Sequence, residues 1–475
     1  MKRISAPPNA TQGVASWPIQ GTGMKFDTRR VVNLRGDDHP NWLTAVVADV
    51  NGAIFELPGY AAAGMAGGHV APLTVAESIV APYGSELMYL PDREPVLFNI
   101  AAGEFEKLHE NPHAPGEPLF PVAVFNSPGY VITHVSAFRE RSRARMLPLF
   151  SYGAAGWHRG QFRSAAIRVD AEPRQDLRRM KPADVSAGVR AVRRRMPANR
   201  LRQHLETCAL RHGCPAGKNF FLGRYEAPLP TAKTCNARCL GCLSLQKESG
   251  ISCTQERIAF TPTSAEIAEV ALFHIGRVKK AVVSFGQGCE GEPLSAARAI
   301  EPAIRLIRSE TGRGTINLNT NASLPEVVGR LCDAGLDSIR VSLNSVRREC
   351  YEAYFRPRGY TFDDVLRSID TALAKGKFVS INYLNSPGFT DTPEEVEAFL
   401  SFMEARPIHM IQWRNLNFDP LRYWKSMDDA APLGTPMGME VLIREIRRGF
   451  PKLVFGYFNP PKEKFEFGFG LSGLG

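Results

Sequence analysis

Three cysteines stand close together in the segment KTCNARCLGC, at positions 235, 239 and 242. Three thiolates from one loop can hold three irons of a 4Fe–4S cluster, which leaves the fourth iron open to a ligand that is not protein. An open iron of this kind is reactive. The spacing of four and then three residues therefore indicates a metal centre that does chemistry.

Two other interpretations of the same cysteines stay open on spacing alone. A structural zinc site needs a closed set of four ligands, and Cys208, Cys214 or Cys253 could supply the fourth. Ordinary buried cysteines are the other alternative. The chain has nine cysteines in 475 residues, too few for a secreted disulfide scaffold, and five of them fall between Cys208 and Cys242.

The chain that carries this loop has the length and composition of a globular protein. At 44% hydrophobic residues it can bury a large core. It has no run of eighteen apolar residues, and the basic N-terminus is not followed by an apolar stretch. We therefore expect a cytoplasmic protein without a membrane span.

Positive charge is concentrated in one segment. The net charge is +10, and residues 174–202 carry ten Lys or Arg against two Asp. The segment is predicted to be a solvated helical connector; the alternative is an anion-binding face for RNA or an acidic leader peptide. It lacks the interleaved aromatic residues that stack on nucleic acid bases.

Changes in composition and in residue pattern along the chain predict four regions. Residues 1–150 form a mostly-β accessory domain with short β-type runs such as 42–50, 85–90 and 130–138, and the first 25 residues are expected to be loosely ordered. Residues 151–228 form the basic helical connector. Residues 229–425 form a barrel, and residues 426–475 a C-terminal extension.

The predicted barrel is an alternation of strand-like and helix-like segments, which implies a parallel sheet. The strand candidates are 229–234, 280–286, 315–321, 338–344, 378–385 and 409–417, and amphipathic segments between them include 264–277, 324–335, 362–376 and 392–405. Six units are too few for a closed eight-stranded barrel. The fold class is therefore α/β, with a partial (β/α)6 barrel, an N-terminal mostly-β domain and a helical connector.

One face of several strands is polar at every second residue, although strands buried on both faces usually read as apolar runs. This pattern predicts a wet or ligand-filled interior; the alternative is an internal network of satisfied hydrogen bonds. The residues concerned are Asn317, Asn319, Asn321, Arg340, Ser342, Asn344, Gln412 and Arg414.

With its cysteine loop placed ahead of the alternating units, the chain resembles the radical S-adenosylmethionine superfamily, whose Cys-x-x-x-Cys-x-x-Cys signature matches Cys235, Cys239 and Cys242. The resemblance covers roughly residues 229–421. It implies that these three cysteines are the metal ligands and the catalytic centre, and that the cofactors are a 4Fe–4S cluster and S-adenosylmethionine.

Further segments are similar to the cofactor contacts of that family. The resemblance implies a glycine-rich methionine-binding element at the end of the second strand and ribose and carboxylate contacts at the ends of later strands. These residues are Glu290, Gly291, Glu292 and Pro293, then Asn319 and Asn321, then Ser342 and Asn344. One position departs from the family pattern: an aromatic residue usually precedes the third cysteine, and this chain has Gly241, so that Leu243 or a later strand must hold the adenine.

The resemblance implies reductive cleavage of S-adenosylmethionine to a 5′-deoxyadenosyl radical, which abstracts hydrogen from a substrate, with a reductant such as flavodoxin or ferredoxin. Residues 320–377 look most like the branch with molybdenum-cofactor and peptide-maturation enzymes. We expect a peptide or protein side chain as substrate. The second alternative is an RNA-modifying enzyme, and the third is a non-enzymatic iron–sulfur or zinc-binding interaction protein.

Two sets of residues are predicted to act beyond the cofactors. Arg340 and Arg414 are candidate substrate ligands because a buried guanidinium needs an anionic partner, the alternative being an internal ion pair with Glu290 or Glu292. An auxiliary cluster would have to draw on Cys208, Cys214, Cys253 or Cys289, since no cysteine follows Cys350.

Overall fold

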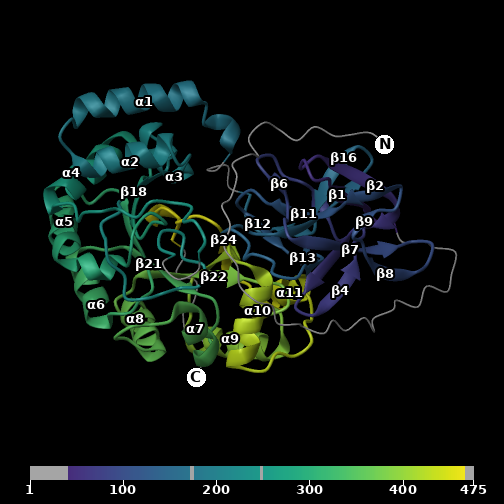
Figure 1. Ribbon diagram of the computed structural model, residues 1–475. Helices are drawn as coiled ribbons and strands as arrows, with labels where there is room; N and C mark the ends of the chain where they lie inside the picture. The colour runs from purple at the N-terminus through teal and green to yellow at the C-terminus, as the bar shows by residue number, and fades with distance from the viewer. Residues whose placement is uncertain (1–40, 172–175, 247–249, 466–475) are drawn as a thin grey trace. The chain divides into compact units, whose positions relative to one another are not determined.

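The computed structural model describes residues 41–171, 176–246 and 250–465, drawn in colour in Figure 1. The predicted loose order of the first 25 residues lies outside the described residues. The chain divides into two compact units. One comprises residues 1–169, 385–397 and 415–446, and the other comprises residues 170–384, 398–414 and 447–475.

The first unit is built on an antiparallel sheet whose central path runs β14-β7-β2-β1-β11-β15-β13-β3-β4. The strands of the unit are β1 Thr44–Ala48, β2 Ile54–Ala61, β3 Ala63–Ala66, β4 His69–Pro72, β5 Ile79–Val80, β6 Glu86–Tyr89, β7 Arg93–Asn99, β8 Glu104–Lys107, β9 Glu110–Asn111, β10 Ala114–Pro118, β11 Phe120–Phe125, β12 Tyr130–Ile132, β13 Val135–Ser136, β14 Phe138–Glu140, β15 Gly153–His158, β16 Gln161–Ser164 and β17 Ala166–Arg168. Of these, β9 pairs with β10 and β12 with β17 in two separate two-stranded sheets. The predicted mostly-β character of this region is confirmed.

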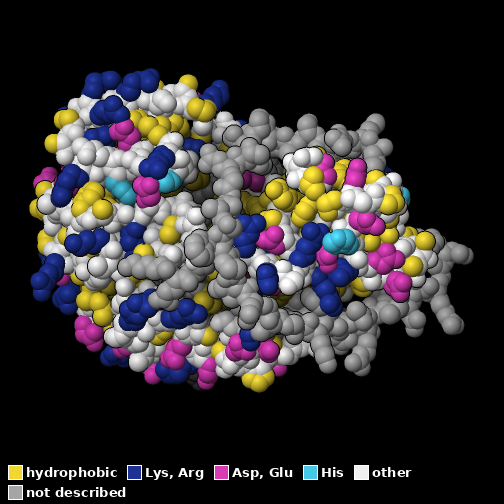
Figure 2. All heavy atoms as spheres, in the orientation of Figure 1, with side chains coloured by type: hydrophobic (Ala, Val, Ile, Leu, Met, Phe, Trp, Pro, Cys, Tyr) yellow, Lys and Arg dark blue, Asp and Glu magenta, His cyan; other side chains and the backbone are white. Residues whose placement is uncertain are grey.

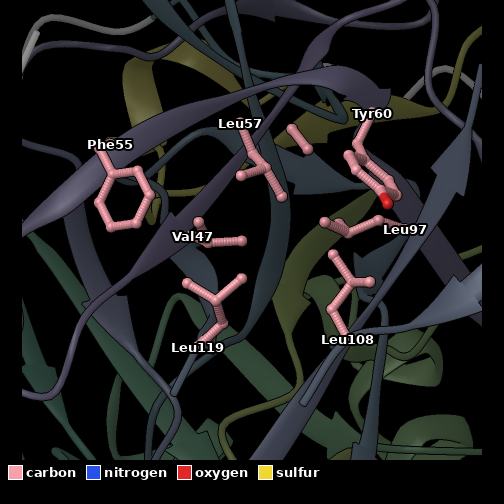
Figure 3. Packing of buried hydrophobic residues seen from close by; sticks show 8 residues of the cluster. Val47, Phe55, Leu57, Tyr60, Leu97, Leu108 and Leu119 are labelled. Atoms are coloured by element: carbon pink, nitrogen blue, oxygen red, sulfur yellow. The ribbon is translucent and has the colours of Figure 1, made fainter. Parts of the chain in front are cut away.

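Alternating apolar residues form a core of this unit. The paired Val47 of β1 and Phe55 of β2 belong to one buried cluster with Leu57 and with Leu97 of β7 (Figure 3). Leu57 and Val47 are fully buried. Because successive strand residues point to opposite faces, Val47 faces this core while Val46 and Ala48 face a second one, so β1 is buried on both sides.

The β unit extends beyond residue 150 and recruits later parts of the chain. Strands β15 to β17 belong to it, as do α10 (Pro420–Ala430) and most of α11 (Met439–Gly449). Arg93 joins two of these parts, since its buried guanidinium lies 2.9 Å from Glu140 and 3.1 Å from Asp419, which caps α10. Removing one partner of such a buried ion pair costs about 3–5 kcal/mol.

The second unit holds a seven-stranded sheet in sequence order, β18-β19-β20-β21-β22-β23-β24. Its strands are β18 Glu226–Pro228, β19 Val282–Phe285, β20 Thr315–Thr320, β21 Ser338–Leu343, β22 Phe378–Asn385, β23 Met410–Asn415 and β24 Val454–Gly456. Its helices are α1 Pro182–Arg195, α2 Arg200–Leu210, α3 Pro215–Phe221, α4 Ser264–Arg277, α5 Ala297–Glu310, α6 Pro325–Ala334, α7 Arg348–Phe355, α8 Phe362–Ala374 and α9 Pro393–Ala405, which continues from the first unit.

The predicted partial α/β barrel is confirmed by this sheet. The pairs from β18 to β22 and the pair β23–β24 run parallel, and α4, α5, α6 and α8 pack side by side along it (Figure 1). Local signals set the helix ends: Thr263 forms a capping box with Glu266 at the start of α4, and Gly335 takes the left-handed conformation that ends α6. The first strand comes earlier than expected, at Glu226–Pro228 rather than 229–234.

The C-terminal segment, predicted only as an extension, completes the sheet. It adds β24 and then crosses the amino-terminal ends of the strands. The Asn459 side chain donates to Glu226 at the start of β18 (2.8 Å), the Lys462 backbone N–H donates to Thr315 at the start of β20 (2.7 Å), and Phe465 stacks on Phe378 at the start of β22. The amino end of the barrel is therefore covered by the chain itself.

The basic connector contains α1, whose two faces differ. Val185, Val189 and Val192 are buried, whereas Arg193, Arg194 and Arg195 of the last turn are exposed, and Figure 2 shows the dark blue side chains over this helix. Arg193 pairs with Glu206 of α2. None of the helices in the described part of the chain has both the length and the apolar character that a membrane span needs.

Candidate active site

The cysteine loop follows β18 and is held by the end of α7. The backbone N–H groups of Arg238 and Leu240 donate to the carbonyls of Phe355 (2.9 Å) and Tyr354 (3.0 Å). Within the loop the Cys242 N–H donates to the Cys239 carbonyl at 3.3 Å. These main-chain bonds fix the path of the loop, so that the three thiols of Cys235, Cys239 and Cys242 come from one anchored turn, each half-buried.

Burial and mutual electrostatic repulsion raise the pKa values of the thiols in this loop. Burial raises the pKa of Cys235 to about 11, and burial followed by the charges of Cys242 and Cys235 raises the pKa of Cys239 well above its ordinary value. Three thiolates are therefore costly here unless a cation lies between them. The Arg257 guanidinium, which donates to Cys242 Sγ at 3.5 Å, supplies one positive group. This donor set fits an iron cluster, whose ligands are thiolates.

Glu290 and Glu292 follow β19 and hold different parts of the site. The Glu290 carboxylate accepts backbone hydrogen bonds from Thr231, Ala232, Gly286 and Gln287 at 2.7–2.9 Å. Burial raises its pKa, and these donors oppose the rise. Glu290 therefore ties the end of the first strand segment to the turn after the second, which makes it a scaffold group.

Glu292 reaches the end of β20 instead. Its buried carboxylate accepts hydrogen bonds from the Asn321 N–H at 2.8 Å, the Leu294 N–H at 3.1 Å and the Thr320 hydroxyl. Burial raises the pKa of Glu292 to about 7. A carboxylate accepts about four hydrogen bonds, so one position remains for a ligand such as an ammonium group.

Gly291 lies against the backbone that leads into the cysteine loop. Its N–H donates to the Ala232 carbonyl at 2.6 Å, and a Cβ at this position would stand 1.9 Å from the carbonyl oxygen of Thr234. Only glycine fits such a close approach. Pro293 follows and begins a short 3-10 helix, Pro293–Ala296.

Three of the predicted asparagines are also engaged within the protein. The Asn319 amide donates to the carbonyls of Phe285 and Gly286, both at 2.9 Å. The Asn321 amide donates to Asn236 of the cysteine loop at 2.9 Å, and the buried Asn344 donates to the Cys350 carbonyl at 3.1 Å. Ser342 of β21 stands in register with Asn382 of β22. Asn236, which follows Cys235 directly, was not predicted, because no spacing or periodicity marks it.

Residues 229–403 match the model of the Radical SAM superfamily. This segment is a radical SAM domain. Its cofactors are a 4Fe–4S cluster and S-adenosylmethionine, and it belongs to an enzyme superfamily. The suspected family membership is confirmed for this part of the chain.

Curated relatives match the same region. The chain is 31% identical over 180 residues to GTP 3',8-cyclase of Heliobacterium modesticaldum, covering 37% of this chain and 50% of the relative. It is 25% identical over 181 residues to the FeMo cofactor biosynthesis protein NifB of Klebsiella pneumoniae, covering 34% and 38%. The chain therefore spans about half the length of the first relative and less of the second.

Solved structures also resemble the chain. A radical SAM methyltransferase from Sphaerobacter thermophilus superposes with a TM-score of 0.35 at 16% identity, covering 48% of this chain and 66% of that one. The [FeFe]-hydrogenase maturase HydG gives 0.33 at 16% identity, covering 59% and 70%.

The interior of the radical SAM domain is polar and partly hydrogen-bonded to itself. In register across β20, β21 and β22 lie Asn319, Arg340 and Ser380. Arg340 is buried and donates to the side-chain oxygen of Gln412 on β23. The predicted alternative of an internal network is thus partly realised, but Gln412 Nε2 and Asn382 Oδ1 are buried atoms with no hydrogen-bond partner among the described residues.

Arg414 stands two residues beyond Gln412 on the same face of β23. Its guanidinium carbon lies 3.9 Å from the centroid of the Tyr457 ring, in the segment after β24. None of the ion pairs among the described residues includes Arg414, so the alternative of an ion pair with Glu290 or Glu292 is not seen for this side chain. Tyr457 was not predicted, because no periodicity marks it as part of the barrel.

The candidate auxiliary cysteines of the radical SAM unit do not all meet. Cys208 of α2 hydrogen-bonds Cys289, and its sulfur lies 3.5 Å from His204 Nε2. These two contacts lower the pKa of Cys208, and the contact with Cys208 together with burial raises the pKa of Cys289. Cys253 is exposed, and Cys332 and Cys350 are buried in helices α6 and α7. His204 was missed, although a histidine one helical turn before a cysteine is a recognisable metal-ligand spacing.

Proposed function

We propose that this protein cleaves S-adenosylmethionine reductively and removes a hydrogen atom from a small polar substrate that carries an anionic group. The observation that carries the substrate class is the polar interior of the barrel. Gln412 Nε2 and Asn382 Oδ1 are buried there without partners among the described residues. Buried polar atoms are nearly always hydrogen-bonded, so these two indicate a ligand that completes them.

Cys235, Cys239 and Cys242 would hold the cluster, and the loop of Gly291 and Glu292 would hold the methionine end of the cofactor. When bound, the cluster supplies the electron that cleaves the sulfonium and so provides a 5′-deoxyadenosyl radical for hydrogen abstraction. The chain's own part is to hold the cysteine loop still. Asn321 does this through Asn236, and the end of α7 does it through the carbonyls of Tyr354 and Phe355.

Aromatic residues behind the loop exclude water from the centre. Tyr351, Tyr354 and Phe355 are buried, and Tyr351 stacks on Phe355 with ring centroids 4.5 Å apart. Burial raises the pKa of Tyr354 far above its usual range, and the neighbouring Cys239 and Cys242 raise it further. Tyr354 therefore stays protonated. A dry wall of this kind protects a reactive intermediate from side reactions with solvent.

Arg414 supplies the positive charge for the substrate's anionic group. Its guanidinium is oriented by stacking on Tyr457 and is not neutralised by an ion pair with a described carboxylate. The names of two curated relatives support a nucleotide-like substrate, since both are GTP 3',8-cyclases. The prediction of a peptide or protein substrate stays untested, and so does the RNA alternative, in which the exposed arginines of α1 would bind phosphates.

The test is an anaerobic assay of the reconstituted protein with S-adenosylmethionine and a chemical reductant. We expect 5′-deoxyadenosine to form, and the Cys235→Ala/Cys239→Ala/Cys242→Ala variant to form none. The substrate class is tested by adding GTP, a tryptic peptide mixture or transfer RNA, each prepared in deuterated form. Deuterium in the 5′-deoxyadenosine from GTP alone supports the proposal. Transfer from peptides or RNA alone contradicts the substrate class but leaves the cofactor chemistry standing.

A further inference from the structure

A cluster of metal-ligating side chains lies outside the radical SAM cysteine loop. His204 and Cys208 are four residues apart on α2 and so lie on one face of the helix, with Cys208 Sγ 3.5 Å from His204 Nε2. Cys289 comes from the turn after β19. One ligand atom of each of these three residues lies within 4.8 Å of the other two. Cys208 and Cys289 are both buried, and His204 is half-buried.

A fourth thiol stands at the edge of this cluster. Cys214 begins α3, and its backbone N–H donates to the Cys208 carbonyl at 3.0 Å, which folds the turn 211–214 back over the end of α2. The Cys214 main chain therefore lies against Cys208, at the edge of the three-residue group. Three ligands, two thiols and one imidazole, thus converge from one helix and one sheet loop, and Cys214 at the start of α3 is the candidate for a fourth.

We propose that His204, Cys208, Cys214 and Cys289 bind one thiophilic divalent ion, Zn²⁺, in a closed structural site. Zinc takes tetrahedral sulfur and nitrogen ligands at about 2.3 and about 2.0–2.1 Å, so neighbouring ligand atoms of one ion stand roughly 3.5–4 Å apart. The 3.5 Å between Cys208 Sγ and His204 Nε2 agrees with that separation. In a 4Fe–4S cluster each cysteine binds a different iron, so its sulfurs stand further apart than this group allows.

Binding requires no oxidant or reductant. Each thiol that is still protonated gives up its proton to water as its sulfur–zinc bond forms, and the neutral imidazole donates the lone pair of its nitrogen. Zinc affinity should therefore rise with pH. The ion replaces the hydrogen bond that now joins Cys208 and Cys289.

The site would act on the turn that precedes the cofactor pocket. Cys289 is followed directly by Glu290, which ties this turn to the first strand segment, and the Cys289 carbonyl accepts a hydrogen bond from Ile258 at 2.8 Å. An ion on Cys289 would anchor the turn to α2 from the opposite side. The inference does not depend on the proposed function, since none of its ligands belongs to the cysteine loop.

The test measures zinc in the full chain carrying Cys235→Ala, Cys239→Ala and Cys242→Ala, so that cluster iron does not interfere. We expect one zinc ion per chain, with sulfur scatterers at about 2.3 Å and nitrogen at about 2.0–2.1 Å in zinc-edge X-ray absorption. His204→Ala and Cys208→Ser should each weaken zinc binding by at least ~100-fold against a zinc-sensitive dye, because loss of an outer partner alone costs about 10–100-fold. His204 is half-buried, so its variant tests the site even where Cys208→Ser fails to fold.

Cys253→Ala is the matched control, since this cysteine is exposed and outside the group. It should bind zinc as tightly as its parent. Any of three results would overturn the proposal. These are zinc that both ligand variants retain, iron and sulfide in the triple variant in place of zinc, and a Cys208–Cys289 disulfide in protein purified without oxygen.

Discussion

The side chain of Asn321, just beyond β20, donates a 2.9 Å hydrogen bond to Asn236, which lies between Cys235 and Ala237. The Asn321 backbone N–H also donates to Glu292 at 2.8 Å. One residue thus joins the cysteine loop to the carboxylate proposed for the cofactor. The two halves of the site are held in a fixed relation by a strand end rather than by the loops themselves.

Asn321→Ala should remove the hydrogen bond between the end of β20 and the cysteine loop without preventing cluster binding. Loss of one buried hydrogen bond with an unpaired partner left behind costs about 1–3 kcal/mol. We therefore expect the variant to take up a cluster but to bind S-adenosylmethionine about tenfold more weakly, which calorimetry would measure. Iron should also leave faster in the presence of a chelator. Ser309→Ala serves as the control, because this exposed hydroxyl bonds only to a carbonyl of its own helix. Equal iron loss in both variants would argue against the bridge.

Glu292 should make stability depend on pH. The pKa of Glu292 is raised to about 7 from its usual 4.5. Between these values the folded protein keeps a proton that the unfolded chain releases, so the free energy of unfolding falls as pH rises from about 4.5 to about 7. The total is on the order of 3 kcal/mol. Glu292→Gln cannot release this proton and should show a flatter dependence.

Urea unfolding of the cluster-loaded protein without S-adenosylmethionine, at several values between pH 5 and pH 8, would measure this difference. The comparison with Glu292→Gln removes the contributions of other buried carboxylates, including Glu290 and Asp391, whose pKa values are also raised. Parallel curves for the two proteins would show that Glu292 titrates normally and is less confined than its contacts indicate.

Much of the barrel could be predicted from the sequence because each unit carries its own local signal. Residues 264–277 were expected to be a helix and form α4 with those bounds, since the Thr263–Glu266 capping box starts it where the apolar period begins. The short segment Val454–Gly456 carries no such signal. It becomes a strand only because β23 offers a free edge, which is a tertiary effect that periodicity does not contain.

The site was predictable in part for a similar reason. The spacing of the three cysteines predicts that they are metal ligands. No such pattern predicts the separate roles of Glu290 and Glu292. Both are buried acids in one short turn, yet one clamps four backbone N–H groups and the other meets Thr320 and Asn321. Only the register of β19 beside β20 separates them. The spacing of His204 and Cys208 on α2 was a local signal, but the third member of their group, Cys289, lies 85 residues from His204 along the chain and only the fold brings it there.

Gly291→Ala should disturb the site through the backbone. The added Cβ would stand 1.9 Å from the Thr234 carbonyl oxygen, so the turn or the entry to the cysteine loop must move. Overpacking of this kind costs about 1–3 kcal/mol. We expect a lower melting temperature and loss of S-adenosylmethionine binding. Gly276→Ala in α4 is the matched control, because its Cβ would meet nothing within 4 Å, and it should stabilise the protein by up to about 1 kcal/mol. A Gly291→Ala variant that binds the cofactor normally would contradict the close approach.

A substitution at Arg414 should affect substrate turnover but not cleavage of the cofactor. Its guanidinium stacks on Tyr457 at 3.9 Å and belongs to the inner face of β23, beyond the Gln412 that pairs with Arg340. Arg414→Ala removes the charge, so we expect substrate turnover to fall by about 10–100-fold, which corresponds to an ionic hydrogen bond of about 1.5–3 kcal/mol. Substrate-free formation of 5′-deoxyadenosine should persist.

The conservative variant separates charge from stacking. Arg414→Lys keeps the positive charge but loses the planar group that lies on the ring, and should show an intermediate turnover. Tyr457→Phe keeps the ring face and should resemble the parent, since the stacking does not use the hydroxyl. Equal loss of turnover and of substrate-free cleavage in Arg414→Ala would instead place Arg414 on the cofactor or in the scaffold.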